Sequence, residues 1–460
     1  SRVVLIADRK QQGYLVDDMQ YVTPALTQIA WKILISSGNF LICLTTTFSA
    51  EIAIVFPSSL QSMNSLMTQT TYILSGTRTA IGTFGGSLSQ FFPSALGAAV
   101  AVEAMKRAAI EPAAIGHVVY GNVISTGPKD AYLGRVAAME AGIPKETPAM
   151  TLNRLCGSGV QAIISATQNI MLGDTEVALA GGAEVMSRAP HYLQTGRFGQ
   201  KMGDATLIDG LTGILTDPFG HGIMGITAEN VAEKYSISRQ DQDEFALESQ
   251  RRAAAAIEAG HFQSQILPIE VKAGRQTKIF DTDEHSKPST TLETLAGLRP
   301  TFKKDGGTVT AGNASGINDA ASAVVLASES YVERTGATPL ARIVAYAHAG
   351  VEPGIMGIGP IPAVRNLLAR TGMKIEDFDV IESNEAFAAQ ALAVSRELGL
   401  DPAKVNPDGG AIALGHPVGA TGVLLTVKAL YHLQRTGGRY GLITMCIGGG
   451  QGIALAIERV

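Results

Sequence analysis

Cysteine is scarce in this chain, with three residues among 460, Cys43, Cys156 and Cys446. They are too few and too isolated for a disulfide framework, and no Cys-x-x-Cys pair indicates a zinc or redox site. The sequence therefore predicts a reducing, cytoplasmic compartment and no metal. Cys156 and Cys446 nevertheless lie in glycine-rich stretches, where a substrate can reach a thiol and backbone amides can point at it.

Aromatic residues and net charge are also low, at 6% and −5. This charge gives no general attraction to nucleic acid or to an anionic membrane surface, so we expect neither as a partner. Glycine, by contrast, is abundant at 51 residues, which is typical of α/β folds with tight turns between small-residue helices and buried strands. A chain of 460 residues also exceeds what one hydrophobic core usually serves, which favours two or three packed units.

Residues 1–66 differ from the rest because glycine is sparse there and Ser, Thr and Gln crowd together. The uncharged stretch Ile33–Ala50 has the length of a membrane span, but its Ser, Thr and Asn residues make it a weak candidate. Acidic residues before it argue against a mitochondrial presequence. We expect residues 1–66 to be an atypical extension that is either non-native to the coding sequence or disordered.

From Thr70 onward the sequence repeats one order of elements. In each half a helix, near 96–109 or 362–370, precedes a strand that ends "VVYGNV" or "VIESNEAF". A glycine turn, an apolar helix, a strand and a glycine pair then follow. The two late helices, "GVQAIISATQNIML" and "GVLLTVKALYHLQ", are apolar on most faces, which predicts that they are buried between sheets.

The segment between the halves has few strands and denser charge, with one long helical run at 239–262. It reads as an inserted loop or lid domain. The predicted domains are therefore an N-terminal half at 67–186 plus 310–336, the insertion at 187–309, and a C-terminal half at 337–460.

Cys156 lies in "NRLCGSGVQA", where an extended segment meets the start of a buried helix. The positive end of a helix dipole and free backbone N–H groups favour a thiolate and can bind an oxyanion. Two other interpretations stay open. Most free cysteines are small buried hydrophobes. Gly157, Gly159 and Ala162, with Glu184 further on, also match the spacing of a dinucleotide-binding turn, which would indicate an NAD-dependent oxidoreductase.

His416, in "GGAIALGHPVGATG", occupies the position in the second half that Cys156 occupies in the first. If the halves are related by a pseudo-twofold axis, the two side chains would meet as nucleophile and base. Cys446 opens "CIGGGQG" at the end of the final apolar strand, and Asn384 ends the strand that matches "YGNV". Taken alone, each of these three residues also has a structural interpretation: a turn contact, a buried thiol and a helix cap.

Together these residues resemble the thiolase family over residues 70–460, because six motifs occur in the order of the family: "NRLCGSG", "MGITAEN", "TAGNASGIND", "NEAFAAQ", "GGAIALGHPVGATG" and "TMCIGGGQG". The resemblance implies an α/β thiolase fold, with two duplicated βαβαβαββ halves in a five-layered α-β-α-β-α sandwich and an inserted loop domain. It also implies a homodimer or homotetramer.

The resemblance implies a ping-pong acyltransferase that condenses acetyl-CoA with acyl-CoA, or cleaves 3-oxoacyl-CoA with coenzyme A, in fatty acid metabolism. Cys156 would carry the acyl group, His416 would take its proton, and Cys446 would move the proton of the acetyl-CoA carbon acid. One oxyanion hole would use His416 and Asn384, and the other the backbone N–H groups of Cys156 and Gly448. No permanently bound cofactor is expected.

Contacts to coenzyme A and the acyl group are implied for Ser315, Lys287, Met224 and Met356. Lys287 stands where relatives often carry arginine, which weakens bidentate phosphate binding but keeps the charge. Ile223 stands where some acetoacetyl-CoA-specific relatives have histidine, so narrow specificity for acetoacetyl-CoA is not expected.

Two further hypotheses share the fold. A ketoacyl synthase would use two histidines beside its cysteine, whereas here Asn384 and Cys446 stand in those places. A protein that only binds acyl-CoA would be favoured by loss of Cys156, His416 or Cys446, and all three are present.

Overall fold

The computed structural model describes residues 30–36, 39–45, 51–53 and 70–460. These fall in two units, within residues 1–68 and 69–460. In the first, β1 (Ala30–Ser36), β2 (Asn39–Thr45) and β3 (Glu51–Ala53) form an antiparallel sheet. The stretch Ile33–Ala50 is thus strand wherever it is described, and the rest of the predicted extension lies outside the described residues. Among the described helices, none has both the length and the apolarity needed to cross a bilayer.

The first half of the second unit is a five-stranded sheet in the order β4-β14-β8-β6-β7. Its strands are β4 (Thr71–Thr79), β6 (His117–Gly121), β7 (Ala149–Leu152), β8 (Val177–Val185) and β14 (Asn318–Ser328). Every residue of β8 and β14 is buried, as expected for strands covered on both faces. β7 is the edge strand.

The second half repeats this order as β15-β18-β17-β16. The strands are β15 (Ala341–Gly350), β16 (Val380–Ser383), β17 (Tyr440–Ile447) and β18 (Gln451–Arg459). In the second half, the strand that would correspond to β7 is reduced to a single bridge between Ile381 and Val405. The sequence repeat therefore does reflect a structural duplication, although the second half has lost most of one strand.

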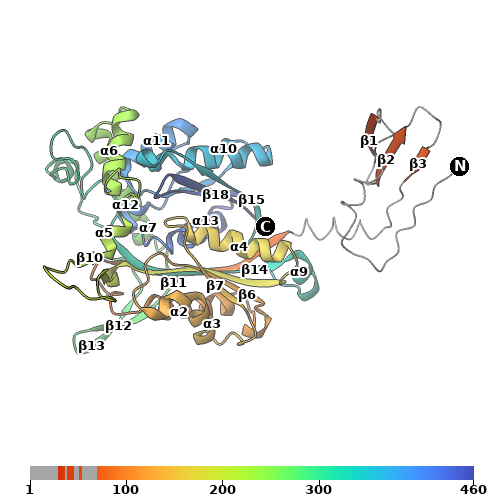
Figure 1. Ribbon diagram of the computed structural model, residues 1–460, viewed down its shortest axis with the longest axis horizontal. Helices are drawn as coiled ribbons and strands as arrows, with labels where there is room; N and C mark the ends of the chain where they lie inside the picture. Colours follow the sequence, from red (N-terminus) through yellow and green to blue (C-terminus); the bar gives the residue numbers. More distant parts are fainter. Residues whose placement is uncertain (1–29, 37–38, 46–50, 54–69) are drawn as a thin grey trace. The chain divides into compact units, whose positions relative to one another are not determined.

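Helices form three layers around these two half-sheets (Figure 1). α2 (Pro93–Arg107) and α3 (Leu133–Glu140) cover one outer face, and α10 (Pro360–Thr371) and α11 (Ala388–Leu398) cover the other. α4 (Ser158–Met171) and α13 (Thr421–Thr436), the two predicted apolar helices, lie between the sheets and share one core with both. The expected five-layered α-β-α-β-α arrangement is confirmed.

The half-sheets also join directly, because β15 pairs with β4 through two residue pairs, Ala341 with Ile73 and Arg342 with Tyr72. The sequence did not predict this junction. It makes one continuous path of nine strands from β16 to β7.

The segment between the halves lies at the end of the sandwich where the candidate site is found (Figure 1). Its helices are α5 (Gly210–Ile214), α6 (Met224–Lys234), α7 (Arg239–Glu258) and α8 (Leu292–Ala296). Its strands are β9 (His191–Tyr192), β10 (Ile208–Asp209), β11 (Ile266–Leu267), β12 (Ile269–Ala273) and β13 (Gln276–Phe280). The other short strands and α-helices of this unit are β5 (Gly82–Thr83), α9 (Glu329–Thr335) and α12 (Ala411–Leu414), and short 3-10 helices join several of the elements.

A buried ion pair fastens this segment to the first half. Arg78 of β4 donates to both carboxylate oxygens of Asp283, at 2.7 and 2.9 Å, and its Nε donates to Gln265 at 2.8 Å. Both charged side chains are almost fully buried. Such bidentate pairs fix geometry as well as contribute energy.

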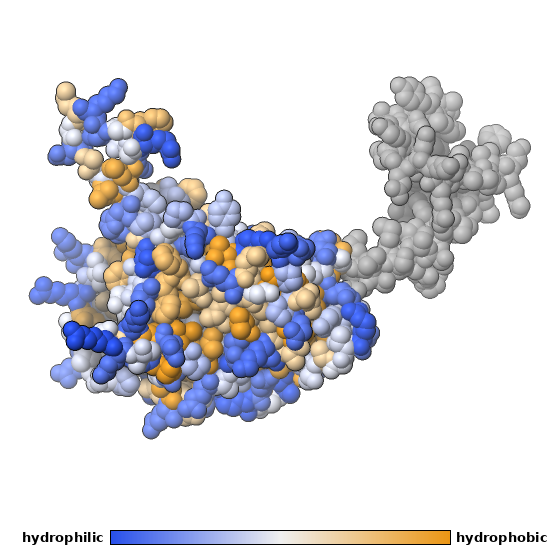
Figure 2. Space-filling view, turned by 90° about the horizontal axis from the view of Figure 1, so that it is seen from below, coloured by the Kyte–Doolittle hydropathy of each residue, from blue (hydrophilic) through white to orange (hydrophobic). Residues whose placement is uncertain are grey.

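The face that carries α2 and α3 is not uniformly polar. Seen from below Figure 1, it has hydrophobic residues in its middle and mostly hydrophilic ones around the rim (Figure 2). Val102 of α2 and Met139 of α3 are among its exposed apolar side chains, and Met150 of the edge strand β7 is exposed as well.

Candidate active site

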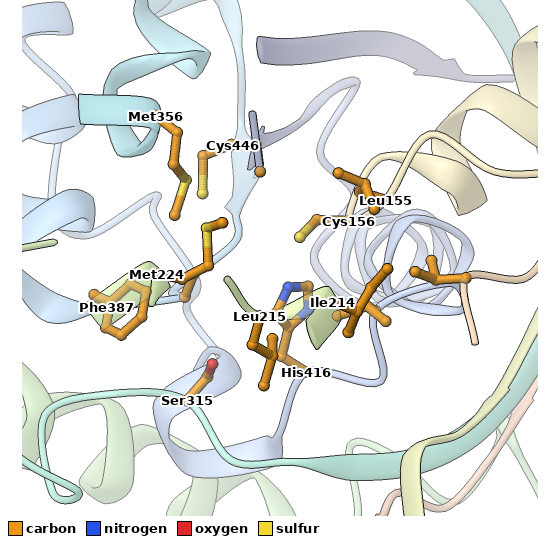
Figure 3. A pocket seen from close by; sticks show the side chains of 14 residues that line it. Leu155, Cys156, Ile214, Leu215, Met224, Ser315, Met356, Phe387, His416 and Cys446 are labelled. Atoms are coloured by element: carbon orange, nitrogen blue, oxygen red, sulfur yellow. The ribbon is translucent and has the colours of Figure 1, made fainter. Parts of the chain in front are cut away.

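One cavity collects most of the residues that the sequence singled out (Figure 3). It encloses about 550 Å³, its open mouth included. Its walls are mainly apolar, and they come from both halves and from the segment between them. The lining residues are Val123, Leu155, Cys156, Ile214, Leu215, Met224, Ser315, Met356, Ala386, Phe387, His416, Val418, Cys446 and Gly448.

Glycines bring the two buried helices together beneath this cavity. A Cβ on Gly159 of α4 would meet the backbone nitrogen of Gly422 at 2.8 Å, and a Cβ on Gly422 of α13 would meet that of Val160 at 2.1 Å. Only two glycines allow backbones to approach this closely. The contact places the start of α4 beside the start of α13, and therefore Cys156 near His416.

The loop before α4 holds Cys156 in a fixed position. Leu155 has φ +46°, an uncommon conformation for a side-chain-bearing residue that costs about 1–3 kcal/mol. Three hydrogen bonds secure it: Leu155 N–H donates to Asn153 Oδ1, Arg154 N–H donates to Ser158 Oγ, and Ser158 Oγ donates to the Leu155 carbonyl. The strain lies directly beside Cys156.

The Cys156 sulfur receives hydrogen bonds from two backbone N–H groups, its own and that of Gly448. Burial nevertheless raises the pKa of this thiol above its ordinary value, and the Glu184 carboxylate adds to the rise. The resting group is therefore a neutral thiol. It needs a base before it can act as a nucleophile.

His416 is poised to be that base. Its Nδ1 lies 2.7 Å from Thr421 Oγ1, and that hydroxyl donates its only proton to the Pro417 carbonyl at 2.9 Å. Thr421 must therefore accept from His416, so the imidazole proton is on Nδ1 and Nε2 has a free lone pair. Burial lowers the pKa of His416 to about 4, which keeps the ring neutral near pH 7.

The backbone of His416 is fixed from another strand. Its N–H donates to Asn318 Oδ1 at 3.0 Å, and Asn318 Nδ2 donates to the Gly82 carbonyl. The glycine-rich loop around His416 is thus tied to β14 and to the turn after β4.

Asn384 lies against the His416 ring without aligning with it. Its amide nitrogen is 3.4 Å from Nε2 and 3.5 Å from Nδ1, almost equally far from both. Its Oδ1 is buried and has no hydrogen-bond partner among the described residues. An unpaired acceptor in that state is suited to hold a water, which can in turn donate a hydrogen bond to a substrate oxygen.

Cys446 reaches the cavity from the opposite side, beside Met356 and Met224 (Figure 3). It lies near the end of β17 and is completely buried. Burial raises the pKa of its thiol far above the ordinary value, and a thiolate at Cys156, when it forms, would raise the pKa further. Two neutral thiols and one neutral imidazole therefore face a single apolar space.

The predicted contact residues divide into two groups. Ser315, Met224, Met356 and Gly448 line the cavity. Lys287 does not: it is exposed, and the contact that fixes it is a hydrogen bond from its backbone N–H to Gln250 Oε1 at 2.8 Å.

The dinucleotide-binding interpretation of the same stretch is wrong. Gly159 faces the backbone of α13, which leaves no room for a pyrophosphate, and Glu184 is fully buried with its oxygens bound to protein N–H groups. Neither residue can contact a ribose. The glycines serve helix packing.

Several residues of the site were missed by sequence reasoning. Val123, Ile214 and Leu215 are ordinary apolar residues whose meeting depends on the tertiary fold. Phe387, Val418, Thr421 and Asn318 were within reach, because all four lie inside motifs that had been recognised. Among the described residues, no group of three or more His, Cys, Asp or Glu side chains could hold a metal ion.

Comparison with known proteins agrees with this geometry. Sequence models of the thiolase N-terminal domain and the thiolase C-terminal domain match residues 71–330 and 337–459. Among curated proteins, the chain is 59% identical over 394 residues to beta-ketothiolase BktB of Cupriavidus necator, covering 86% of this chain and all of that one. It is 47% identical over 388 residues to the human mitochondrial 3-ketoacyl-CoA thiolase, covering 84% and 98%.

Solved structures agree as well. The crystal structure of human mitochondrial 3-ketoacyl-CoA thiolase superposes with a TM-score of 0.83 at 47% identity, over 86% of this chain and all of that one. The Bacillus anthracis acetyl-CoA acetyltransferase gives 0.84 at 46% identity, with the same coverage. Two domain matches that together span the second unit, and relatives of this identity aligned over almost their full length, establish that this chain is an enzyme of the thiolase family.

Proposed function

We propose that this thiolase cleaves 3-oxoacyl-CoA with coenzyme A, and catalyses the reverse condensation of acetyl-CoA with acyl-CoA, through an acyl group carried on Cys156. The observation that supports this most directly is the composition of the cavity. A thiol beside a neutral imidazole, facing a second thiol, provides a nucleophile, its base and a separate proton carrier.

In the first half-reaction, His416 Nε2 takes the proton of Cys156, and the sulfur attacks the C3 carbonyl of the 3-oxoacyl thioester. The new S–C3 bond replaces the C2–C3 bond, whose electron pair leaves with C2 as the enolate of acetyl-CoA. Cys446 gives its proton to C2, so acetyl-CoA departs and Cys446 is left as a thiolate.

In the second half-reaction, the Cys446 thiolate takes the proton of incoming coenzyme A. The CoA sulfur attacks the acyl carbon on Cys156, and the S–C bond to Cys156 breaks. His416 returns its proton to Cys156, which restores all three groups to their resting states. The high pKa of Cys446 suits both transfers. Its thiol keeps its proton until a base as strong as the enolate is present, and its thiolate is a strong enough base to take the proton of the CoA thiol.

Two oxyanion sites follow from the same arrangement. The N–H groups of Cys156 and Gly448, which bind the sulfur in the resting enzyme, lie where the tetrahedral intermediates on Cys156 would place their oxygen. The protonated Nε2 of His416 and a water held by the unpaired Oδ1 of Asn384 would donate to the thioester oxygen of the enolate.

The apolar walls indicate substrates beyond acetoacetyl-CoA. Ile214, Leu215 and Val123 offer no polar contact to an acyl chain. Ile223, just before α6, stands where some relatives that are specific for acetoacetyl-CoA have histidine. Two relatives are named as a beta-ketothiolase and a 3-ketoacyl-CoA thiolase, and a solved relative is in complex with CoA. Ser315 would contact the pantetheine arm.

A homotetramer in the cytoplasm, acting in fatty acid metabolism, completes the proposal. β7 is a short edge strand whose outer backbone groups are free to pair with a second copy. The loop between β9 and β10 exposes a cluster of apolar side chains that a tetramer would cover. The domain limits of 67–186 plus 310–336, 187–309 and 337–460 belong to the same proposal.

The decisive experiment is an assay of CoA-dependent cleavage on acetoacetyl-CoA and on a 3-oxoacyl-CoA with a longer chain. We expect the parent to cleave both, and Cys156→Ala to lose at least about a thousandfold in kcat, because the acyl carrier is gone. A parent without cleavage, or Cys156→Ala with undiminished cleavage, contradicts the proposal.

Cys446→Ala tests the division of labour. This variant should lose C–C bond cleavage by about a hundredfold or more, while exchange of labelled coenzyme A into acetyl-CoA falls much less, since exchange requires no carbon acid. The same assays separate the two rival hypotheses. A protein that only binds acyl-CoA would show neither cleavage nor exchange. A ketoacyl synthase would release CO₂ from a malonyl thioester.

A further inference from the structure

Glu184 is a buried carboxylate that the proposed chemistry does not use. It lies near the end of β8 and is 0% exposed. Among the described residues, no Lys, Arg or His lies within salt-bridge distance of it. An ionisable group buried without a counter-charge is costly, so its presence requires a compensating role.

Four N–H donors surround this carboxylate. Oε1 accepts from Asn122 Nδ2 at 3.0 Å and from Ile124 N–H at 3.1 Å. Oε2 accepts from Val123 N–H and from Gly419 N–H, both at 2.9 Å. Because each oxygen already accepts twice, a proton on either one would have no acceptor. The site is built for the charged carboxylate.

These donors come from two loops that belong to different halves of the molecule. Residues 122–124 follow β6 of the first half, and Val123 lines the cavity. Gly419 belongs to the loop of the second half that carries His416 and Val418, which also line it. Glu184 thus joins the two walls that flank Cys156.

Glycines keep both loops within reach of the carboxylate. A Cβ on Gly419 would meet Glu184 Oε2 at 2.4 Å, and a Cβ on Gly182 would meet the Gly419 carbonyl at 2.4 Å. The His416 loop therefore lies directly on the end of β8, with no side chain between them.

Glu184 also acts on Cys156 through its charge. The Glu184 carboxylate is the charged side chain that raises the pKa of Cys156, while burial raises the pKa of Glu184 itself to about 8. Cys156 titrates above about pH 8.5, its ordinary value, and therefore at a pH where Glu184 is ionised. The other titratable groups nearby are His416, Cys446 and, behind Glu184, Asp130.

We propose that Glu184 is a positioning residue. Its carboxyl group holds Val123 and the His416 loop in place around Cys156, and once it is ionised its negative charge opposes ionisation of the Cys156 thiol. This inference rests on the proposed function of Cys156 and His416, and assigns a task to a residue outside the cavity.

The test is the pH dependence of Cys156 alkylation by iodoacetamide, followed by peptide mass between about pH 7 and about pH 11, in the parent and in Glu184→Gln. Loss of the charge should lower the midpoint by roughly 1 unit, which makes alkylation about tenfold faster below the midpoint. In the cleavage assay, kcat should fall about tenfold or more with little change in KM for coenzyme A.

Glu229→Gln is the matched control. Glu229 is also buried and also accepts from backbone N–H groups, those of Thr308 and Val309, but its charge does not act on Cys156. Its variant should keep the parent midpoint even if it unfolds more easily. A folded Glu184→Gln with the parent midpoint overturns the proposal, because a purely structural residue would leave that midpoint unchanged.

Glu184→Asp keeps the charge but is one methylene too short to bind all four donors. It should retain the parent midpoint and lose about tenfold in kcat. If Glu184→Gln does not fold, Glu184→Asp becomes the decisive variant, because an unchanged kcat in it overturns the positioning role. Alkylation needs no turnover, so a failure of this inference is distinguishable from a failure of the proposed function, which Cys156→Ala tests.

Discussion

At the scale of single residues, the reactivity of this site depends on neutral groups. Burial keeps both thiols protonated and the imidazole unprotonated at rest. Charge then appears only when a substrate fills the cavity and completes the proton transfers. An apolar pocket of this kind strengthens every interaction with that charge.

Thr421 gives the first prediction at this scale. Thr421→Val removes the acceptor for His416 Nδ1–H, so the ring loses the contact that fixes its tautomer. We expect kcat for acetoacetyl-CoA cleavage to fall roughly tenfold to a hundredfold. Thr421→Ser, which keeps the hydroxyl, should restore most of the activity. If Ser is as poor as Val, the methyl group matters more than the hydrogen bond.

The low pKa of His416 predicts a pH-dependent stability. Its folded value of about 4 lies below the unfolded value of about 6.5, so the unfolded chain binds more protons between these limits. Folding stability is therefore lost as the pH falls through this window, by up to about 3 kcal/mol. Urea unfolding of the parent and of His416→Gln should show it.

The two curves should converge on acidification, because His416→Gln lacks this proton-linked loss. A difference in unfolding free energy that stays constant from about pH 7 to about pH 4 would contradict the assignment of the buried neutral imidazole.

Cys156, His416 and Cys446 could be singled out from the sequence because each lies in a local motif, and the structure brings all three to one cavity. Much of the apolar wall could not, since Val123, Ile214 and Leu215 carry no signature until the fold brings them together. Lys287, which was inferred from the resemblance, lies on the exposed surface outside this cavity, and its contact with coenzyme A stays a prediction.

At the scale of elements, the site depends on the crossing of α4 and α13. Their glycine contact leaves no space for a side chain, so helix packing and catalysis are coupled at Gly159 and Gly422. Motifs that resemble a phosphate-binding turn can therefore have a purely steric cause.

Gly422→Ala tests this crossing. The new Cβ would lie 2.1 Å from the Val160 nitrogen and 2.8 Å from the Gly159 carbonyl carbon, neither of which can rotate away. We expect the free energy of unfolding to fall by about 1–3 kcal/mol or more, with kcat reduced as Cys156 and His416 separate. In Gly297→Ala the nearest atoms would be 3.5 and 3.6 Å away, so this control should behave like the parent.

The element pattern was predictable where burial is strong. The two apolar helices and the duplicated order of strands both followed from hydrophobic patterning. The single bridge at Val405 and the short β4–β15 junction did not, because one or two residue pairs leave no periodic signal in a sequence.

At the scale of the whole molecule, the proposed tetramer makes a prediction about the loop between β9 and β10. Phe198 and Met202 are 88% and 90% exposed, which is unusual for large apolar side chains in a monomer. The double variant Phe198→Ser with Met202→Ser should sediment as a dimer where the parent sediments as a tetramer.

Ile279→Ser is the control for that experiment. Ile279 is also an exposed apolar residue, but it lies on the hairpin of β12 and β13. Its replacement should leave the sedimentation coefficient unchanged. A double variant that sediments like the parent would show that the β9–β10 loop does not hold the assembly together.

The position of β18 has a consequence for how the protein is made. β18 lies between β15 and β17, yet it follows both of them along the chain. Cys446 lies near the end of β17, and the turn from β17 to β18 carries Gly448. The first half can complete its own sheet much earlier in translation. The nascent chain therefore exposes an unfilled gap between β15 and β17 until β18 has been made, and the second half-sheet is complete only when that gap is closed.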